Sequence, residues 1–174
     1  MRRTIRKIFP VRILKHIFPE KEILIESISP DDARKECLMN EELFMHIDPL
    51  AHEWHSSLKG AEAGEVQLEV WQVLKNKSCV SKIFEELGRG SLKSLCLQQS
   101  QIARFIRVYG HSEIMKDCRA TMFLTEVDDE VVVIEFQSFP EMDRLVPQIF
   151  STATHHAWRL VGGPTRRLQI VVPK

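Results

Sequence analysis

The chain has 174 residues, no net formal charge, 44% hydrophobic side chains and 28% charged side chains. These values are close to the averages of globular domains, and they exclude a disordered, fibrous or collagen-like protein. A chain of this length buries roughly two thirds of the surface that its unfolded form exposes, which is enough for one domain with a hydrophobic core.

The charges are unevenly distributed along the chain. Residues 1–19 carry six basic side chains and no acidic one, whereas residues 20–69 carry thirteen acidic and four basic side chains. Such a basic segment can bind an anionic partner, or it can lie against acidic segments of the same chain, and we favour the second interpretation. We predict a basic amphipathic arm over residues 1–19 and a single domain over residues 20–174, helical over 29–109 and rich in strands over 119–173.

The apolar residues of the arm indicate packing on the domain. Ile13, Leu14, Ile17 and Phe18 recur at helical spacing, and these side chains would be wasted on a freely solvated polybasic tail. We expect a short turn of helix or an extended segment here, and peripheral contact with a membrane surface is the alternative.

The first helices are predicted from their start signals. Ser29 and Pro30 are followed by two acidic residues, which is typical of a helix N-terminus, so we expect a helix toward residue 38. Residues 40–42 either continue this helix or cap a second one over 43–47. Asp48 and Pro49 repeat the start signal, and we expect a third helix over 48–60 that ends at Gly60.

The secondary structure of the middle of the chain is harder to predict from its sequence. Residues 65–74 fit both an alternating strand and a helical face, and we favour the helix. A short helix is expected from Ser78 to Gly88, with Ile83, Phe84 and Leu87 facing inward. A longer helix is expected over 99–108, because the apolar residues of that segment share one face and Gly110 follows.

From residue 119 the hydrophobic period changes to that of strands. Residues 120–126 and 130–136 predict an antiparallel hairpin that turns at Asp128 and Asp129. Residues 149–153, 158–161 and 167–172 are further strand candidates. Helices followed by strands predict an α+β fold, in which N-terminal helices pack on a small, mainly antiparallel C-terminal sheet.

Several short stretches of the second half share one resemblance: Leu95-Cys96-Leu97, Gln99, Gln101, Ile102, Phe105, residues 120–124, Trp158 and residues 168–173. They are similar to the C-terminal block of an uncharacterised family of bacterial hypothetical proteins, over roughly residues 65–174. The chain departs from that block at Gln98, at Cys118-Arg119 and at Gly162-Gly163-Pro164. The resemblance implies a C-terminal module attached to variable N-terminal regions, and it implies no catalytic or binding residue.

Three features of the sequence indicate the cellular compartment of the protein. They are the cysteines, the length of the apolar stretches and the N-terminal segment. The cysteines form no C-x-x-C pair, so we expect free, buried thiols rather than a zinc knuckle or a redox pair: Cys37, Cys79, Cys96 and Cys118. No apolar stretch approaches the roughly 20 residues of a membrane span, and no signal-peptide pattern is present. We expect a cytoplasmic protein.

Histidines and acids are most concentrated between residues 46 and 55. His46, His52 and His55 lie beside Asp48 and Glu53, but the spacing is not that of the H-E-x-x-H metal motif. We expect neither a metal nor a cofactor. A catalytic role of the His155-His156 pair is the less favoured interpretation, because neighbouring residues of a strand point to opposite faces.

Three classes of function remain, and we rank them in order. The first is a non-enzymatic binding or adaptor module for a protein partner, the second a nucleic-acid-binding protein, and the third a small enzyme. Basic and amide side chains of the arm and of the 99–108 helix are the candidate contacts with nucleic acid or a partner: Arg2, Arg3, Arg6, Lys7, Gln99, Gln101, Arg104 and Arg107.

Overall fold

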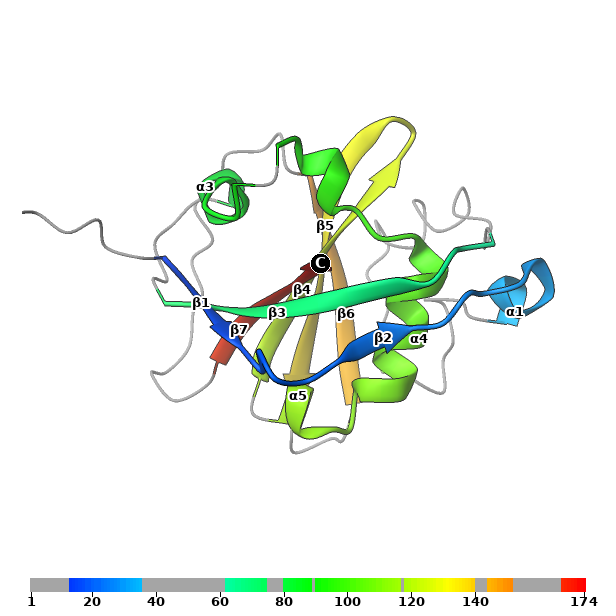
Figure 1. Cartoon of the computed structure of the whole chain (residues 1–174), viewed down its shortest axis with the longest axis horizontal. Coiled ribbons are helices and arrows are strands. Elements are labelled where there is room, and N and C mark those ends of the chain that lie inside the picture. The colour runs from blue at the N-terminus through cyan, green and yellow to red at the C-terminus, as the bar shows by residue number, and fades with distance from the viewer. Residues whose placement is uncertain are drawn as a thin grey trace, which may run out of the picture.

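The computed structural model describes residues 13–35, 62–74, 80–88, 90–116, 118–139, 144–151 and 167–174. These residues form one mixed sheet of seven strands (Figure 1). The strands are β1 (Leu14–Ile17), β2 (Ile23–Ile25), β3 (Val66–Val73), β4 (Cys118–Val127), β5 (Glu130–Phe139), β6 (Arg144–Ser151) and β7 (Arg167–Pro173). The helical elements are α1 (Pro30–Lys35), α3 (Val80–Glu85), α4 (Gln99–Tyr109), α5 (Glu113–Lys116) and the 3₁₀ turn η1 (Leu92–Leu95).

The centre of the sheet is formed by the C-terminal half of the chain. The strand order is β1-β3-β7-β4-β5-β6, and β2 pairs with β3 beyond the end of β1. The predicted hairpin is confirmed, because β4 and β5 pair antiparallel from Ala120 opposite Gln137 to Val127 opposite Glu130. Asp128 and Asp129 form its turn with φ values of 48° and 66°, a conformation that aspartate tolerates better than most residues.

The expected fold class is wrong. The sheet is mixed, because β7 runs parallel to β4, and it is not confined to the C-terminal part, since β1, β2 and β3 extend it. The helical interpretation of residues 65–74 caused the error. Both faces of β3 are covered, with Leu68 and Val70 buried on one side and Val73 on the other, so its apolar residues also fit a helical spacing.

The end of the basic arm is a strand rather than a turn of helix. Leu14 pairs with Val73 and is buried, and Ile17 and Phe18 pack against the core. The apolar residues of the arm therefore contact the domain through an edge strand. Residues 1–12 lie outside the described part of the chain.

Several helix predictions are confirmed where the structure describes them. The backbone N–H of Asp32 donates to Oγ of Ser29 at 3.2 Å, which caps α1 as its sequence indicated. In α4, Gln98 is the N-cap and forms a reciprocal capping box with Gln101, and Gly110 is the C-cap. The helices expected over 43–47 and 48–60 and the strand expected over 158–161 lie outside the described residues.

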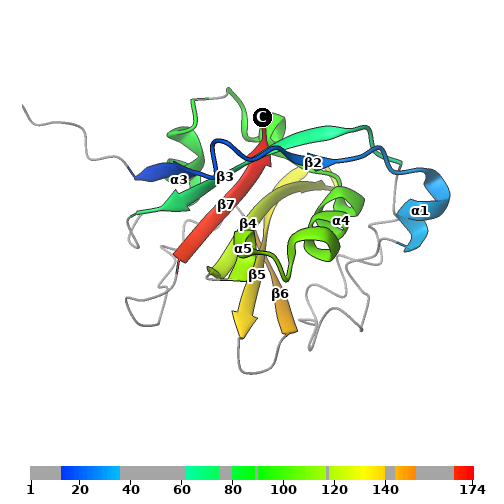
Figure 2. The ribbon, with the colours of Figure 1, turned by 60° about the horizontal axis from the view of Figure 1, so that its bottom comes forward.

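The two faces of the sheet are covered by different elements. On the α4 face, Phe123 and Phe136 pack beneath α4 and α5, and Phe105 of α4 meets Phe123 with ring centroids 5.2 Å apart. On the α3 face, Met122 and Leu124 belong to a second cluster with residues of α3 and η1. Figure 2 shows α4 against one side of the sheet and α3 beyond the strand β1.

Candidate functional site

Glu135 is an acidic residue in the middle of the sheet. It lies on β5 opposite Met122 of β4, so it belongs to the α3 face, and its side chain is only 2% exposed. Carboxylates are rarely this buried, because removing a charge from water is costly unless the charge is paired. Glu135 therefore needs a structural or a functional explanation.

Its surroundings hold the carboxyl group near its titration point at neutral pH. Burial raises the pKa of Glu135 to about 7, while the hydrogen bond from Gln137 and the positive charge of Arg119 act in the opposite direction. Nε2 of Gln137 donates to Oε1 of Glu135 at 3.0 Å. A carboxyl group with this pKa can donate or accept a proton near pH 7, as a general acid or base must.

Among the described side chains next to Glu135 on β4 and β5, no second carboxyl group is found. The neighbours of Glu135 and Gln137 on β4 are Met122 and Ala120, which carry no ligand or titratable group. In the described ranges, no group of three or more His, Cys, Asp or Glu side chains could hold a metal ion. The arrangement there suits proton transfer by a single residue better than a carboxylate pair or a metal centre.

The described neighbours of Glu135 differ in exposure. Val133, the preceding residue on the same face, is buried, as is Met122 across the strand pair. Gln137 is partly exposed, and so is Arg119. Among the described residues named here, the amide of Gln137 and the guanidinium of Arg119 are therefore in contact with solvent, whereas the carboxyl group of Glu135 is covered.

A second buried polar group lies on the α4 face and is fully paired. Nε2 of Gln169 donates to Oγ1 of Thr121 at 3.0 Å and to the carbonyl of Ile114 at 3.1 Å. Its Oε1 accepts from Nε of Arg167 at 3.2 Å. Every polar atom of this amide has a partner, so we interpret it as a structural link between β7, β4 and α5.

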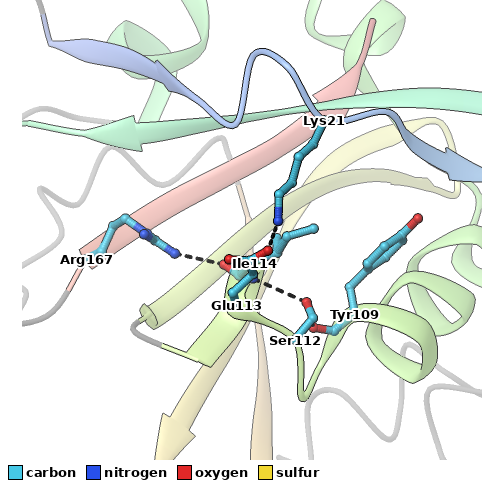
Figure 3. A network of polar contacts seen from close by, with 6 residues as sticks. All are labelled: Lys21, Tyr109, Ser112, Glu113, Ile114 and Arg167. Atoms are coloured by element: carbon cyan, nitrogen blue, oxygen red, sulfur yellow. Dashed lines mark hydrogen bonds and ion pairs between the residues drawn. The ribbon is translucent and has the colours of Figure 1, made fainter.

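Charged side chains connect several elements near Gln169, and Figure 3 shows their contacts with α5. Nη2 of Arg167 donates to the carbonyl of Ile114 at 2.9 Å, and Lys21 forms an ion pair with Glu113 of α5. Lys21 and Arg167 both lie 5.3 Å from the centre of the Phe18 ring. These contacts join the segment after β1 to α5 and β7.

The structure separates the candidate contact residues of α4. Gln99 and Gln101 are buried, and Gln101 accepts from the N–H of Gln98 and donates to the carbonyl of Gly64, both at 2.9 Å. Arg104 is partly buried, and Arg107 is exposed. Gln101 therefore holds the start of the helix in place, and of the two arginines Arg107 is the more accessible to solvent.

The other residues singled out in the sequence fall outside the described part of the chain. These are Arg2, Arg3, Arg6 and Lys7 of the arm, the cluster of His46, Asp48, His52, Glu53 and His55, and the pair His155-His156. The contact, metal and catalytic predictions made for them stay predictions.

The described cysteines do not form a reactive site. Cys96 and Cys118 are free thiols, and Cys118 is buried. Burial raises the pKa of Cys96 to about 11, so this thiol stays protonated at neutral pH and is a poor nucleophile.

Sequence reasoning missed Glu135, although a signal was present. The run from Val131 to Ile134 predicts a central strand covered on both faces, and Glu135 continues that run at a position that must also be buried. An acid inside a strand of this kind is a candidate for a perturbed pKa. Only the register with Met122 shows which face it occupies.

The chain was also compared with known proteins. No family model, no curated protein sequence and no solved structure matches it. Among the helices that the structure describes, none has the length and apolar character needed to cross a membrane.

Proposed function

We propose that the chain is a small enzyme that uses Glu135 as a general acid or base. The observation that carries the proposal is a carboxyl group buried in the central sheet, held by Gln137 and brought by burial to a pKa of about 7. Perturbed carboxyl groups of this kind are concentrated at catalytic sites, although structural networks also produce them.

The partly exposed Arg119 beside the site supports an anionic ester as the class of substrate. Arg119 carries a fixed positive charge whose field reaches Glu135. In the ionised state, the carboxylate of Glu135 takes a proton from water as the water oxygen attacks the ester. The carboxylic acid formed in this way then returns the proton to the leaving oxygen, so Glu135 is regenerated.

A panel of chromogenic esters tests this proposal. We expect the full chain to hydrolyse p-nitrophenyl phosphate or bis(p-nitrophenyl) phosphate faster than neutral p-nitrophenyl acetate, with an apparent pKa near 7 in the rate profile. Glu135→Gln removes the titrating group, and we expect a loss of about 100-fold or more in rate.

Glu130→Gln is the matched control, because it makes the same chemical change at the exposed start of the same strand. Its rate should equal that of the unmodified chain. Equal rates for the unmodified chain and Glu135→Gln, or no hydrolysis of any ester above the uncatalysed rate, would contradict an enzymatic role.

A second proposed function is a binding module for a protein partner, with nucleic acid as the other candidate partner. The observation that favours it is the outer side of the end of α4, where Arg107 is exposed and Val108 is 54% exposed. Large apolar side chains beside an arginine are common at protein interfaces. Arg104 and Arg107 of α4, together with the basic residues that the sequence has in residues 1–19, are the basis of the nucleic-acid alternative.

Salt dependence separates these two partners. Binding of a labelled duplex oligonucleotide that falls steeply with salt, and less steeply in Arg107→Gln, would support nucleic acid, because each lost phosphate contact reduces the slope by about 0.9. We expect no such binding. Capture of a defined protein partner that is lost in Val108→Asp would support the adaptor function, whereas partner binding unchanged by Val108→Asp would exclude this surface.

The cytoplasm is the compartment we propose. The free thiols of Cys96 and Cys118 support a reducing environment, in which cysteines remain unpaired. Retention of the full chain in the soluble cytosolic fraction of its own cells, with both thiols reactive to an alkylating agent only after unfolding, is the expected result.

A further inference from the structure

Gln137 and Glu135 lie two residues apart on β5 and belong to the same face of the sheet. Their partners in register on β4 are Ala120 and Met122, and the partner of Glu135 on β6 is Gln148. Two such positions on one strand are about 6–7 Å apart, so the ends of their side chains meet only when both lean along the strand. Nε2 of Gln137 and Oε1 of Glu135 are 3.0 Å apart. This contact therefore fixes the direction in which the carboxyl group points.

The two oxygens of Glu135 have different surroundings. Oε1 accepts from the amide of Gln137, whereas no hydrogen bond to Oε2 is formed by the part of the chain that the structure describes. When the carboxyl group is protonated, its carbonyl oxygen is a better acceptor than its hydroxyl oxygen. The oxygen that accepts from Gln137 is therefore the carbonyl oxygen of the protonated group, and the proton lies on Oε2.

The charged and titratable groups near this face act on Glu135 less directly. Arg119 of β4 acts on it through its positive charge. At η1, Lys93 pairs with an exposed carboxylate at the end of β4 at 2.9 Å, and the thiol of Cys96 donates to a backbone carbonyl at 3.5 Å. The buried side chains of α3 and η1 on this face are apolar: Ile83, Phe84 and Leu95. Among these described groups, the amide on β5 is the one that distinguishes between the two oxygens.

We propose that Gln137 is a positioning residue for Glu135: it holds Oε1 as the acceptor of its amide, so that Oε2 is the atom that takes up and releases the proton. This inference rests on the acid–base function proposed above. In that reaction, Oε2 of the carboxylate takes the proton of the attacking water and returns it to the leaving oxygen. Oε1 keeps its hydrogen bond throughout, and Gln137 itself neither gains nor loses a proton.

The charge of the acceptor determines what the loss of Gln137 does. A hydrogen bond from an amide is stronger to a carboxylate than to a carboxylic acid, so Gln137 lowers the pKa of Glu135, in opposition to burial. Removing this donor must therefore raise the pKa. An amide turned the other way, with its oxygen accepting from protonated Glu135, would have the opposite effect. The sign of the change distinguishes the two arrangements.

The first test follows the titration of Glu135 itself and requires no activity. The full chain is labelled with ¹³C, and the resonance of the Glu135 carboxyl carbon is assigned by its absence from Glu135→Gln. We expect Gln137→Leu to raise the titration midpoint by about one pH unit, because the lost hydrogen bond had a charged acceptor. Gln137→Asn, whose amide is one methylene group shorter, should shift the midpoint in the same direction. Two variants are used so that a failure of one to fold still leaves a measurement.

Gln67→Leu is the matched control. Nε2 of Gln67 donates to Oε1 of Glu22 at 3.1 Å, but both side chains are exposed and lie on other strands or loops. The substitution removes the same kind of hydrogen bond without touching β5. The titration midpoint of Glu135 should be the same in this variant as in the unmodified chain.

The second test identifies the oxygen that carries the proton. The infrared difference spectrum between pH 5 and pH 9 contains the C=O stretching band of the protonated carboxyl group, and the band missing from Glu135→Gln belongs to Glu135. A hydrogen bond to the carbonyl oxygen weakens the C=O bond. The band should therefore lie at a higher frequency in Gln137→Leu than in the unmodified chain.

Hydrolysis of the esters adds a reading that a purely structural role would not change. In Gln137→Leu, the apparent pKa of the rate profile should rise with the titration midpoint, and kcat should fall by about tenfold while KM stays within about twofold. An unchanged or lowered midpoint in either Gln137 variant, or a band at the same frequency, would overturn the positioning role. A raised midpoint and a shifted band in a chain that hydrolyses no ester would contradict the enzymatic function and still support the proton on Oε2.

Discussion

Each of the two faces of the sheet buries a polar side chain, and the two side chains differ in charge and in hydrogen bonding. On the α4 face, Gln169 is neutral and has a partner for its carbonyl oxygen and two acceptors for its amide group. On the α3 face, Glu135 is titratable, and among the described side chains Gln137 donates a hydrogen bond to it. The first arrangement stabilises the fold at any pH, whereas the second has a stability that depends on its proton.

The difference teaches how to tell a structural polar group from a functional one in this fold. A satisfied amide can be buried at little net cost, because its hydrogen bonds to water are replaced. A buried carboxylate is costly in its ionised state. The fold is therefore less stable at neutral pH than it would be with a neutral side chain at this position, and what it retains is a group that can move a proton. Four substitutions on these faces, and one at the rim, test the contrast.

The largest effect is expected from the apolar packing of the α4 face. Phe123 is fully buried and meets both Phe105 and Phe136 edge-on, with centroids 5.2 and 5.7 Å away. Phe123→Ala should lower the free energy of unfolding by about 4 kcal/mol, through lost burial and the cavity left behind. Urea unfolding followed by circular dichroism measures it.

Val131→Ala is the comparison on the α3 face, where this side chain is only partly buried. We expect Val131→Ala to lower the free energy of unfolding by about 1 kcal/mol, because the side chain of Val131 loses less contact with water on folding than a fully buried one does. A loss as large as that of Phe123→Ala would mean that the α3 face is packed as tightly as the α4 face.

The pH dependence of unfolding tests the contrast at Glu135. Because the folded state raises the pKa from 4.5 to about 7, the group contributes stability below pH 4.5, and this contribution is lost as pH rises through 7. The loss amounts to about 3 kcal/mol. Glu135→Gln should match the unmodified chain near pH 4.5 and be more stable than it at pH 8.

Chemical unfolding of both proteins at several pH values between 4.5 and 8 provides the measurement. The difference between the two curves isolates Glu135 from all other titrating groups. A constant difference across this range would show that Glu135 has an ordinary pKa, and the proposed acid–base function would lose its main support.

An element could be predicted from the sequence where its residues indicated one kind of secondary structure and no other. The hairpin of β4 and β5 has β-branched runs around two aspartates, and α4 has an apolar face between a glutamine cap and Gly110, so both were predicted close to their observed bounds. Strand β3 was not, because its apolar residues fit a helical face as well as an alternating strand, and the helix was favoured. The parallel pairing of β7 with β4 is a long-range property that no local signal contains.

The site was less accessible to sequence reasoning than the fold. The amide side chains of Gln99 and Gln101 were predicted to contact a partner at the surface. Inside the fold, however, Gln101 takes part in the capping box of α4 and donates to the backbone carbonyl of Gly64. Glu135 reads as one more acid in a chain of many until its burial is known. Burial and hydrogen-bond partners, rather than residue type, decide the role of each.

The paired amide on the α4 face is expected to give a smaller effect, and one without pH dependence. Gln169→Leu leaves Oγ1 of Thr121 and the guanidinium of Arg167 with one partner fewer, so the free energy of unfolding should fall by about 2 kcal/mol. The loss should be the same at pH 5 and pH 8, measured by urea unfolding. A loss that changes between these values would show that the network titrates, and the contrast with Glu135 would fail.

The smallest effect is expected at the rim of the α3 face, where Glu126 makes an exposed ion pair with Lys93 at 2.9 Å. Glu126→Gln makes the same change as Glu135→Gln, on the same face of the same hairpin, but in contact with water. Exposed pairs contribute little, because solvent screens the charges and two long side chains lose freedom when they pair. We therefore expect the unfolding midpoint of Glu126→Gln in urea to stay within the scatter of repeat measurements at pH 8, and to be unaffected by added salt. A stabilisation at pH 8 like that expected of Glu135→Gln would mean that removing any acid from this face has the same effect, so that burial of Glu135 is not the cause.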